Sequence, residues 1–419
     1  MPDAVIVAAA RTPIGRAYKG SLASLRPDDL AARAVEAALG QVPSLEPQTI
    51  DDVMVGCGSP GGEQGFNLAR VVTVLLGLDG VPGTTVTRYC ASSLQTTRMA
   101  LHAIRAGEGH VFVSAGVECV SRARAGTSDN PPAEPDADPR DRSRNPWRNP
   151  LFESAQSVTR EQSVVGATRW TDPRMHGQFP DIYIAMGQTA ENVAQVKGVS
   201  RRDQDEFGVR SQNLAEKAIA DGFWAREITP VELADGTMVT ADDGPRPGVS
   251  YAAVSQLPPV FRPDGTVTAG NCCPLNDGAA ALVVMSDVRA RELGITPLAR
   301  IVATGVSALS PELMGLGPVE ATRRALALAG MSIGDIDLVE INEAFAAQVL
   351  ASQRDLGIDL DRLNVNGGAI AVGHPFGMTG ARIATTLVNS LRTHDKQFGL
   401  ETMCVGGGQG MAMILERLS

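Results

Sequence analysis

The chain of 419 residues is long enough for two or three domains, each with its own hydrophobic core. Its 43% hydrophobic and 20% charged residues are typical of a soluble globular protein, and a net charge of −10 argues against a nucleic-acid partner. No apolar stretch approaches the roughly 18–20 residues of a membrane span, and the opening residues lack the features of a signal peptide. The sequence therefore predicts a cytoplasmic protein without a membrane segment.

Six cysteines occur, at positions 57, 90, 119, 272, 273 and 404. None belongs to a CxxC pair, and the spacing matches neither a disulfide framework nor a structural zinc site. We therefore expect reduced thiols and no metal.

The elements predicted from the first third of the chain recur in its last third. Residues 3–15 and 49–60 each read as an apolar strand ending in a turn, and residues 27–40 between them have helical spacing. The same order of strand, helix and strand starts again at residue 297. This internal repeat indicates two halves of similar topology.

The second part of each half repeats as well. Residues 84–107 and 363–392 both predict a strand, a turn and an amphipathic helix. Each half then closes with an apolar strand, over 111–121 and 400–416. Because strands and helices alternate, the sequence predicts an α/β fold of two tandem halves packed together.

A segment of different composition separates the halves. Residues 126–150 carry six prolines and charges of both signs, which predicts a loop. Residues 200–223 predict an amphipathic helix that starts near Ser200. We predict an N-terminal half over 1–123 plus 256–290, an insertion over 124–255 and a C-terminal half over 291–419.

Cys90 lies where an apolar run meets a predicted helix. A thiol at a helix N-terminus is stabilised as thiolate by the free N–H groups and the helix dipole. The same donors could hold an oxyanion beside the sulfur. Cys90 is thus a candidate nucleophile, with a small buried core residue as the alternative.

Three further candidates follow predicted strands. His374 is bracketed by glycines and a proline, and Cys404 precedes three glycines whose N–H groups could stabilise an oxyanion. A structural turn would explain either residue equally well. Asn342 could hold a water or a carbonyl, although an N-cap is the default interpretation. Because α/β folds place their sites at strand ends, the four residues together point to nucleophilic catalysis.

At this point the motifs resemble those of the thiolase family. They occur in order as ARTPIG (10–15), CASS (90–93), TAGN to NDGAAALVVMS (268–286), NEAFA (342–346), NGGAIAVGHPFGMTGARI (366–383) and CVGGGQG (404–410). The resemblance extends from about residue 4 to residue 418. It implies a thiolase-like fold in αβαβα layers, with coenzyme A held by the insertion, and a homodimer or homotetramer. The implied reaction is reversible cleavage of 3-oxoacyl-CoA, of the fatty-acid β-oxidation type.

The resemblance also implies a role for each candidate. Cys90 would be the acylated nucleophile, His374 its activator and Cys404 the general acid and base. Asn342 would position a water in one oxyanion hole that His374 completes, and the N–H groups of Cys90 and Gly406 would form the second. No metal or redox cofactor is implied, because coenzyme A is itself a substrate.

Substrate or coenzyme A contacts are expected from Arg246, Met186, Cys273, Met314 and Phe345. Arg246 stands where the family offers an arginine to the nucleotide, and Cys273 where a serine commonly contacts pantetheine. A thiol is a weaker hydrogen bonder than a hydroxyl. Ala185 stands where acetoacetyl-specific members often carry a histidine, which favours a degradative role over a biosynthetic one.

Three alternatives stay open. The first is an acetoacetyl-CoA-forming biosynthetic thiolase. The second is a 3-oxoacyl synthase, which usually pairs its cysteine with two histidines or with one histidine and an asparagine, so that Cys404 argues against it. The third is a catalytically idle protein that binds coenzyme A or lipid, although such relatives tend to lose the NEAFA or GHP block, both intact here.

Overall fold

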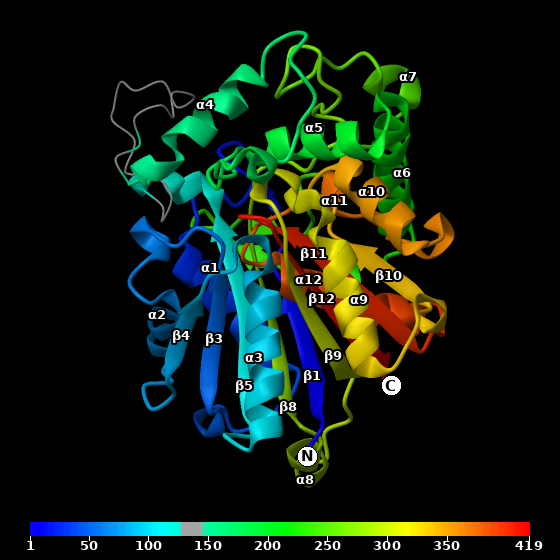
Figure 1. Ribbon diagram of the computed structural model, residues 1–419. Coiled ribbons are helices and arrows are strands. Elements are labelled where there is room, and N and C mark those ends of the chain that lie inside the picture. The colour runs from blue at the N-terminus through cyan, green and yellow to red at the C-terminus, as the bar shows by residue number, and fades with distance from the viewer. Residues whose placement is uncertain (127–144, 146) are drawn as a thin grey trace.

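The strands of both halves join in one mixed sheet in the computed structural model, which describes residues 1–126, 145 and 147–419 (Figure 1). The N-terminal strands are β1 (Ala4–Arg11), β3 (Asp52–Cys57), β4 (Gly83–Val86), β5 (Val111–Cys119) and β8 (Asn276–Ser286). The C-terminal strands are β9 (Ala299–Ala308), β10 (Leu338–Ile341), β11 (Phe398–Val405) and β12 (Gln409–Arg417). Their order is β10-β11-β12-β9-β1-β8-β5-β3-β4, and the short β2 (Gly15–Arg16) pairs with β8. β1 connects the halves, because it pairs with β8 along its length and with β9 at Val5 and Ile6.

Helices cover the sheet in layers. The outer face of the N-terminal strands packs against α1 (Pro27–Gly40) and α2 (Leu68–Leu75), and that of the C-terminal strands against α9 (Gly317–Ala329) and α10 (Ala346–Leu356). Between the two sets of strands lie α3 (Ser92–Ala106) and α12 (Thr379–Thr393), in the innermost apolar core. The predicted succession of α, β, α, β and α layers is thereby confirmed.

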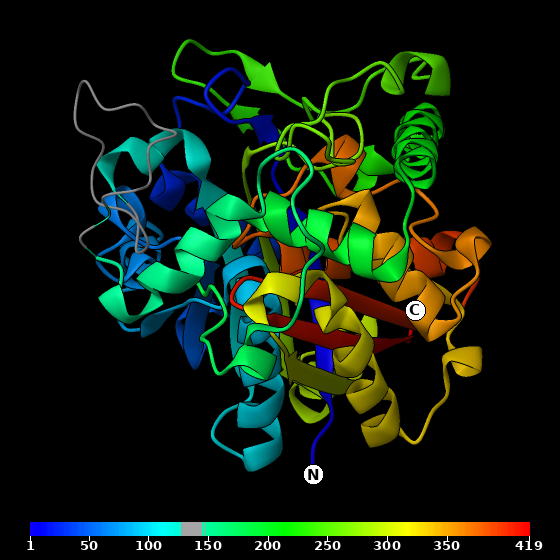
Figure 2. The same ribbon diagram turned by 45° about the horizontal axis from the view of Figure 1, so that its top comes forward.

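The insertion supplies α4 (Glu153–Glu161), α5 (Met186–Lys197), α6 (Arg201–Ala220), β6 (Val231–Glu232), β7 (Met238–Val239) and α7 (Tyr251–Val254). Figure 2 brings α5 and α6 forward, across one end of the sheet. Ser200 is the N-cap of α6, and its hydroxyl accepts a hydrogen bond from the N–H of Asp203 at 3.1 Å. The loop predicted over 126–150 lies mostly outside the described residues.

The ARTPIG motif (10–15) connects the insertion to the sheet through its arginine. Arg11 at the end of β1 is fully buried and forms ion pairs with Glu227 at 2.6 Å and Asp242 at 2.7 Å. A buried arginine needs such partners because an unpaired charge costs several kcal/mol, on the order of 3–5. ARTPIG therefore has a structural role in this fold.

Two predicted strands are wrong. The run over 400–416 is a hairpin of β11 and β12, because Gly407 and Gly408 have φ values of 75° and 76° and reverse the chain. The strand expected at the start of 363–392 is absent from the described structure, where only isolated bridges occur. There Asn364 and Gly367, with φ values of 46° and 81°, turn the backbone towards the short helix α11 (Ala369–Val372).

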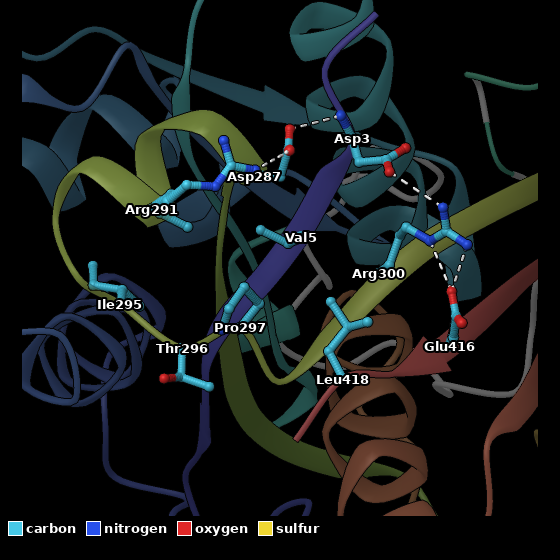
Figure 3. A pocket seen from close by; sticks show the side chains of 11 residues that line it. Asp3, Val5, Asp287, Arg291, Ile295, Thr296, Pro297, Arg300, Glu416 and Leu418 are labelled. Atoms are coloured by element: carbon cyan, nitrogen blue, oxygen red, sulfur yellow. Dashed lines mark hydrogen bonds and ion pairs between the residues drawn. The ribbon is translucent and has the colours of Figure 1, made fainter.

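Two general features complete the fold. A depression of about 510 Å³ opens near both chain termini, beside α8 (Asp287–Glu292), where Arg300 pairs with Asp3 and Glu416 (Figure 3). It contains none of the predicted site residues. Within the described parts of the chain, no helix is both long and apolar enough to cross a membrane.

Candidate active site

Cys90 sits in a tight turn at the start of α3. The turn is η3 (Tyr89–Ala91), and Tyr89 has a left-handed φ of 45°, which is uncommon for an aromatic residue. Ser92 holds the turn, because its hydroxyl donates to the carbonyl of Tyr89 at 2.6 Å and accepts from the N–H of Arg88 at 2.9 Å. The thiol is thereby fixed in place, with 8% of the residue exposed.

The environment of Cys90 favours the thiol form. Burial raises its pKa to about 12, and the nearby Glu118 raises it further. The backbone N–H groups of Gly406 and of Cys90 itself oppose this shift. The expected thiolate, stabilised by the helix N-terminus, is therefore not the resting state, since desolvation outweighs the donors.

The imidazole of His374 is held in place through its Nδ1 atom. Its Nδ1 lies 2.6 Å from the hydroxyl oxygen of Thr379, which donates its own hydrogen to the carbonyl of Pro375 at 2.7 Å. Nδ1 therefore carries the proton, and Nε2 keeps its lone pair. Burial, with a smaller contribution from Arg382, lowers the pKa of His374 to about 3, so the imidazole is neutral.

Asn342 follows β10 and faces the histidine. Its side-chain Nδ2 lies 3.2 Å from Nε2 of His374, and its Oδ1 has no hydrogen-bond partner among the described residues. Its carbonyl accepts a hydrogen bond from Gln348 at 2.6 Å. Because Phe345 occupies the N-cap position of α10, the default interpretation of Asn342 as an N-cap is wrong.

Cys404, at the end of β11, brings a second thiol to the site. Burial raises its pKa above the ordinary range, and a charge on Cys90 would raise it further. Burial likewise raises the pKa of Cys273, with additional contributions from Cys272, Cys90 and Cys404. Three thiols from separate segments are thus near enough to influence one another's ionisation. Among the described residues, no group of three or more His, Cys, Asp and Glu side chains could hold a metal ion.

Hydrogen bonds connect the two halves of the fold near Cys90 and His374. The N–H of Ala381 in α12 donates to the hydroxyl of Ser93 in α3 at 2.9 Å. The N–H of Gly377 donates to Glu118 of β5 at 2.9 Å. These bonds join the segment that follows His374, in the C-terminal half, to α3 and β5 of the N-terminal half, and α3 directly follows the turn that contains Cys90.

Most of the predicted substrate contacts share one apolar cluster with Cys404. Its buried members are Ala190, Val267, Met314, Ala344, Phe345 and Cys404, and Met186, Phe261, Cys272 and Cys273 pack against it partly exposed. Arg246 lies outside this cluster, exposed in the loop between β7 and α7. The same loop packs against α11, the short helix before His374. A Cβ atom added to Gly244 of this loop would lie only 2.1 Å from the carbonyl oxygen of Ala371.

Sequence reasoning missed several supporting residues. Thr379 orients His374, and Asn276 accepts the N–H of His374 at 2.9 Å. Tyr89 packs its ring against Gly406, where an added Cβ would lie 3.1 Å from it. Thr379 and Asn276 lie within the quoted motifs, but their contacts depend on the folded geometry.

Replacing Thr379 by valine is expected to lower kcat about tenfold with little effect on KM, because valine keeps the shape but cannot accept the Nδ1 proton. Thr385→Val is the matched control on the same helix, since its hydroxyl donates to the carbonyl of Ala381. Steady-state kinetics of both variants measures the difference. Equal kcat values in the two variants would contradict a role for Thr379 in orienting the imidazole.

Comparisons with known proteins identify the family of the chain. The profile described as thiolase, N-terminal domain, matches residues 4–288, and that described as thiolase, C-terminal domain, matches residues 295–417. The 3-oxoadipyl-CoA/3-oxo-5,6-dehydrosuberyl-CoA thiolase of Escherichia coli strain K12 is 43% identical over 428 residues, with 100% of both chains covered. The 3-ketoacyl-CoA thiolase of Bacillus subtilis strain 168 is 41% identical over 429 residues, covering 99% of this chain and 100% of the relative.

A solved structure shows the same fold. The crystal structure of human mitochondrial 3-ketoacyl-CoA thiolase in complex with CoA matches with a TM-score of 0.83 and 36% identity. The match covers 99% of this chain and 98% of the human one. With both family profiles spanning nearly all its residues, the chain belongs to the thiolase family and is an acyltransferase.

Proposed function

We propose that this protein cleaves 3-oxoacyl-CoA with coenzyme A, giving acetyl-CoA and a shortened acyl-CoA through an acyl thioester on Cys90. One observation carries the proposal. The buried thiol of Cys90 lies near Cys404 and near the backbone of Gly406, which lowers its pKa, and the buried imidazole of His374 is neutral. This combination suits acyl transfer without a metal or redox cofactor.

The first half-reaction forms the acyl-enzyme. His374 Nε2 takes the proton of Cys90 as the sulfur attacks the C3 carbonyl of the substrate. The developing oxyanion is stabilised by the new Nε2–H and by a water held at Asn342. Collapse of this intermediate breaks the C2–C3 bond and leaves an acetyl-CoA enolate, which Cys404 protonates.

The second half-reaction releases the acyl group. Cys404, now a thiolate, takes the proton of an incoming coenzyme A thiol, whose sulfur attacks the thioester on Cys90. The N–H groups of Gly406 and Cys90, which lower the pKa of the Cys90 thiol, would hold the thioester oxyanion. The Cys90 sulfur departs and takes back the proton held on Nε2 of His374, which restores the resting enzyme.

The substrate is proposed from the cluster around Cys404 and from the names of relatives. Apolar side chains such as Met314 and Phe345 suit an acyl chain. The relatives are named for 3-oxoadipyl-CoA and for 3-ketoacyl-CoA in general. We therefore propose a degradative role of the fatty-acid β-oxidation type in the cytoplasm. Arg246 and Cys273 are proposed to contact the nucleotide and the pantetheine.

A chain-length series tests the function. The enolate absorbance of 3-oxoacyl-CoA substrates should fall in a coenzyme A-dependent manner, and Cys90→Ala serves as the blank. Activity on medium or long chains supports the degradative role, whereas activity restricted to acetoacetyl-CoA would indicate the biosynthetic one. Preference for 3-oxoadipyl-CoA would indicate dicarboxylic substrates. A folded protein that binds coenzyme A without any turnover would point to the idle binding relative.

We also propose a homo-oligomer, because β4 ends the sheet with a half-buried strand edge (Figure 1). Such an edge offers unpaired N–H and C=O groups to a second copy. Light scattering on the purified chain should give the mass of a dimer or tetramer. A monomer at micromolar concentration would contradict this proposal.

A further inference from the structure

Three consecutive glycines form the turn between β11 and β12, and the first of them is Gly406, a donor of the proposed oxyanion hole. Val405 and Gln409 pair on either side of this glycine turn and close the hairpin. Glycine restricts its own backbone less than any other residue, so the turn does not by itself fix the direction of a peptide N–H. An oxyanion hole works through donors that are oriented before the reaction. Contacts from outside the glycines must therefore hold this turn.

Gln409 supplies such a contact from the end of the turn. Its side-chain Nε2 donates a hydrogen bond to the carbonyl oxygen of Gly406 at 3.2 Å. The carbonyl and the N–H of Gly406 belong to the two rigid peptide planes that meet at its Cα atom. The hydrogen bond fixes the first plane, and the pairing of Val405 with Gln409 restrains the second. The side chain of Gln409 thereby limits the directions in which the N–H of Gly406 can point.

Arg88 connects Gln409 to the turn that carries Cys90. Its Nη1 donates to Oε1 of Gln409 at 3.0 Å, across 321 positions of the chain. Arginine has donors only, so the amide oxygen faces Arg88 and the amide nitrogen is left to face Gly406. The backbone of Arg88 belongs to the Cys90 turn, because its N–H donates to the hydroxyl of Ser92 at 2.9 Å. One arginine thus joins the turn of the nucleophile to the glycine turn.

The charge of Arg88 strengthens this connection. Its Nε is buried without a hydrogen-bond partner among the described residues. Burial lowers the pKa of Arg88, the nearby Arg98 lowers it further, and no carboxylate raises it. The guanidinium stays protonated all the same. Its charge therefore acts on the amide of Gln409, where it strengthens the first hydrogen bond and makes Nε2–H a better donor for the second.

Other contacts of the glycine turn do not set the direction of the Gly406 peptide. The carbonyl of Gly408 accepts the N–H of Leu309 at 2.7 Å, which fixes the far end of the turn next to β9. The ring of Tyr89 packs beside Gly406, where an added Cβ atom would lie 3.1 Å from it. This packing limits the space around the glycine but offers its carbonyl no donor. The amide of Gln409 is the group that does.

We propose that Arg88 and Gln409 are positioning residues, and that their two consecutive hydrogen bonds orient the N–H of Gly406 towards the thioester oxyanion formed on Cys90. This inference rests on the proposed function. Because the bonds run from the N-terminal half to the C-terminal half, they fix the donor relative to the nucleophile and not only within its own hairpin. Acyl transfer is sensitive to such placement, since a donor contributes only when it lies at hydrogen-bond distance from the developing charge.

Gln409→Met tests this proposal, because methionine keeps the length of the side chain but cannot donate to the carbonyl of Gly406. Mass spectrometry follows two reactions of Cys90: acylation by acetyl-CoA, which forms an oxyanion, and alkylation by iodoacetamide, which forms none. Acylation should slow about 30-fold, less than the roughly 10²–10³-fold expected when a donor is removed outright. Alkylation should change by less than about threefold, since it depends on the thiolate and not on the oxyanion hole.

Gln397→Met is the matched control at the opposite end of the same hairpin. There Nε2 of Gln397 donates to Glu416 at 3.2 Å and to the carbonyl of Arg417 at 3.1 Å. Both reactions of Cys90 should keep their wild-type rates in this variant. If acylation and alkylation slow equally in Gln409→Met, or if neither slows, the proposal is overturned.

Two variants of Arg88 test the other member of the pair. Its contact with Gln409 uses one nitrogen, so Arg88→Lys keeps a cationic donor and should acylate Cys90 within about threefold of the wild-type rate. Arg88→Met leaves the amide of Gln409 without the charge that orients it, and acylation should slow about tenfold. Equal acylation rates in these two variants would contradict the role of Arg88.

The direction of the Gly406 peptide can also be measured without any reaction. A crystal structure of Gln409→Met should show the carbonyl of Gly406 rotated from its wild-type direction, and an unchanged carbonyl would overturn the proposal. The two proposals can therefore fail separately. Wild-type protein that acetyl-CoA does not acylate at Cys90 would refute the proposed function, while a rotated carbonyl in the variant would still support the positioning of Gly406 by Gln409.

Discussion

Replacing Cys90 by alanine is expected to abolish thiolysis, with a loss of at least about 10⁴-fold in kcat, because no other group can carry the acyl intermediate. The fold should survive. Removal of one buried sulfur deletes few contacts and should cost about 1 kcal/mol of unfolding free energy. Turnover of a 3-oxoacyl-CoA and a thermal unfolding curve measure the two effects on the same sample.

A matched control separates catalysis from packing. Cys119 is also a buried thiol, but it belongs to the outer core of the N-terminal half. Cys119→Ala should therefore lose similar stability while keeping its activity. Unfolding of Cys90→Ala under conditions where Cys119→Ala is folded would count against the catalytic assignment, since Cys90 would then be needed for structure.

The spacing of apolar residues predicted the helices and strands of the layers better than the turns that connect them. The helix over 27–40 was recognisable because Leu30, Ala34, Val35 and Ala38 share one face, and all four are buried. The hairpin at 404–410 was missed because an apolar run on both sides of three glycines looks continuous. A Cβ on Gly408 would come within 2.3 Å of the carbonyl of Leu309, and this close approach is a tertiary property.

The same limit applies to the site. The sequence pointed to Cys90, His374, Cys404 and Asn342 by their places at strand ends, and the structure brings Cys90 near Cys404 and Asn342 next to His374. It could not predict the protonation states. A helix N-terminus alone predicts a thiolate, whereas the desolvation that reverses this preference comes from both halves.

The contacts that support His374 and its neighbours could not be predicted from the sequence for a related reason. Asn276 binds the N–H of His374 from 98 positions away along the chain, and Glu118 binds that of Gly377 from 259 positions away. Spacing carries no information about such contacts. Buried charges such as Glu401 are equally hard to interpret, since the β11 pattern reads as an ordinary strand.

The resting site is therefore a neutral thiol and a neutral imidazole. The low pKa of His374, about 3, and the high pKa of Cys90, about 12, make a permanent ion pair unfavourable. In the proposed reaction, proton transfer therefore accompanies attack on the substrate, when the oxyanion offers a place for the negative charge. That proposal gives the N–H groups at Gly406 and His374 the role of stabilising the oxyanion.

Replacing Cys404 by alanine is expected to reduce thiolysis by about 10³-fold, because the enolate then lacks a proton donor and coenzyme A lacks a base. Cys90 and its donors remain intact. Acetyl-CoA should therefore still acylate Cys90 slowly, since this step needs only attack on the thioester and departure of coenzyme A. Intact-protein mass spectrometry should detect one added acetyl group in Cys404→Ala and none in the Cys90→Ala,Cys404→Ala double variant.

The two readouts distinguish a role in proton transfer from a role in shaping the pocket. Cys404 also packs with Met314 and Phe345, so alanine could loosen the acyl site. Loosening would slow acylation and thiolysis together, whereas loss of an acid and base spares acylation. Full thiolysis in Cys404→Ala would exclude the proton-transfer role, and a loss confined to thiolysis would place the second thiol where the reaction needs it, at the α-carbon of the leaving acetyl-CoA.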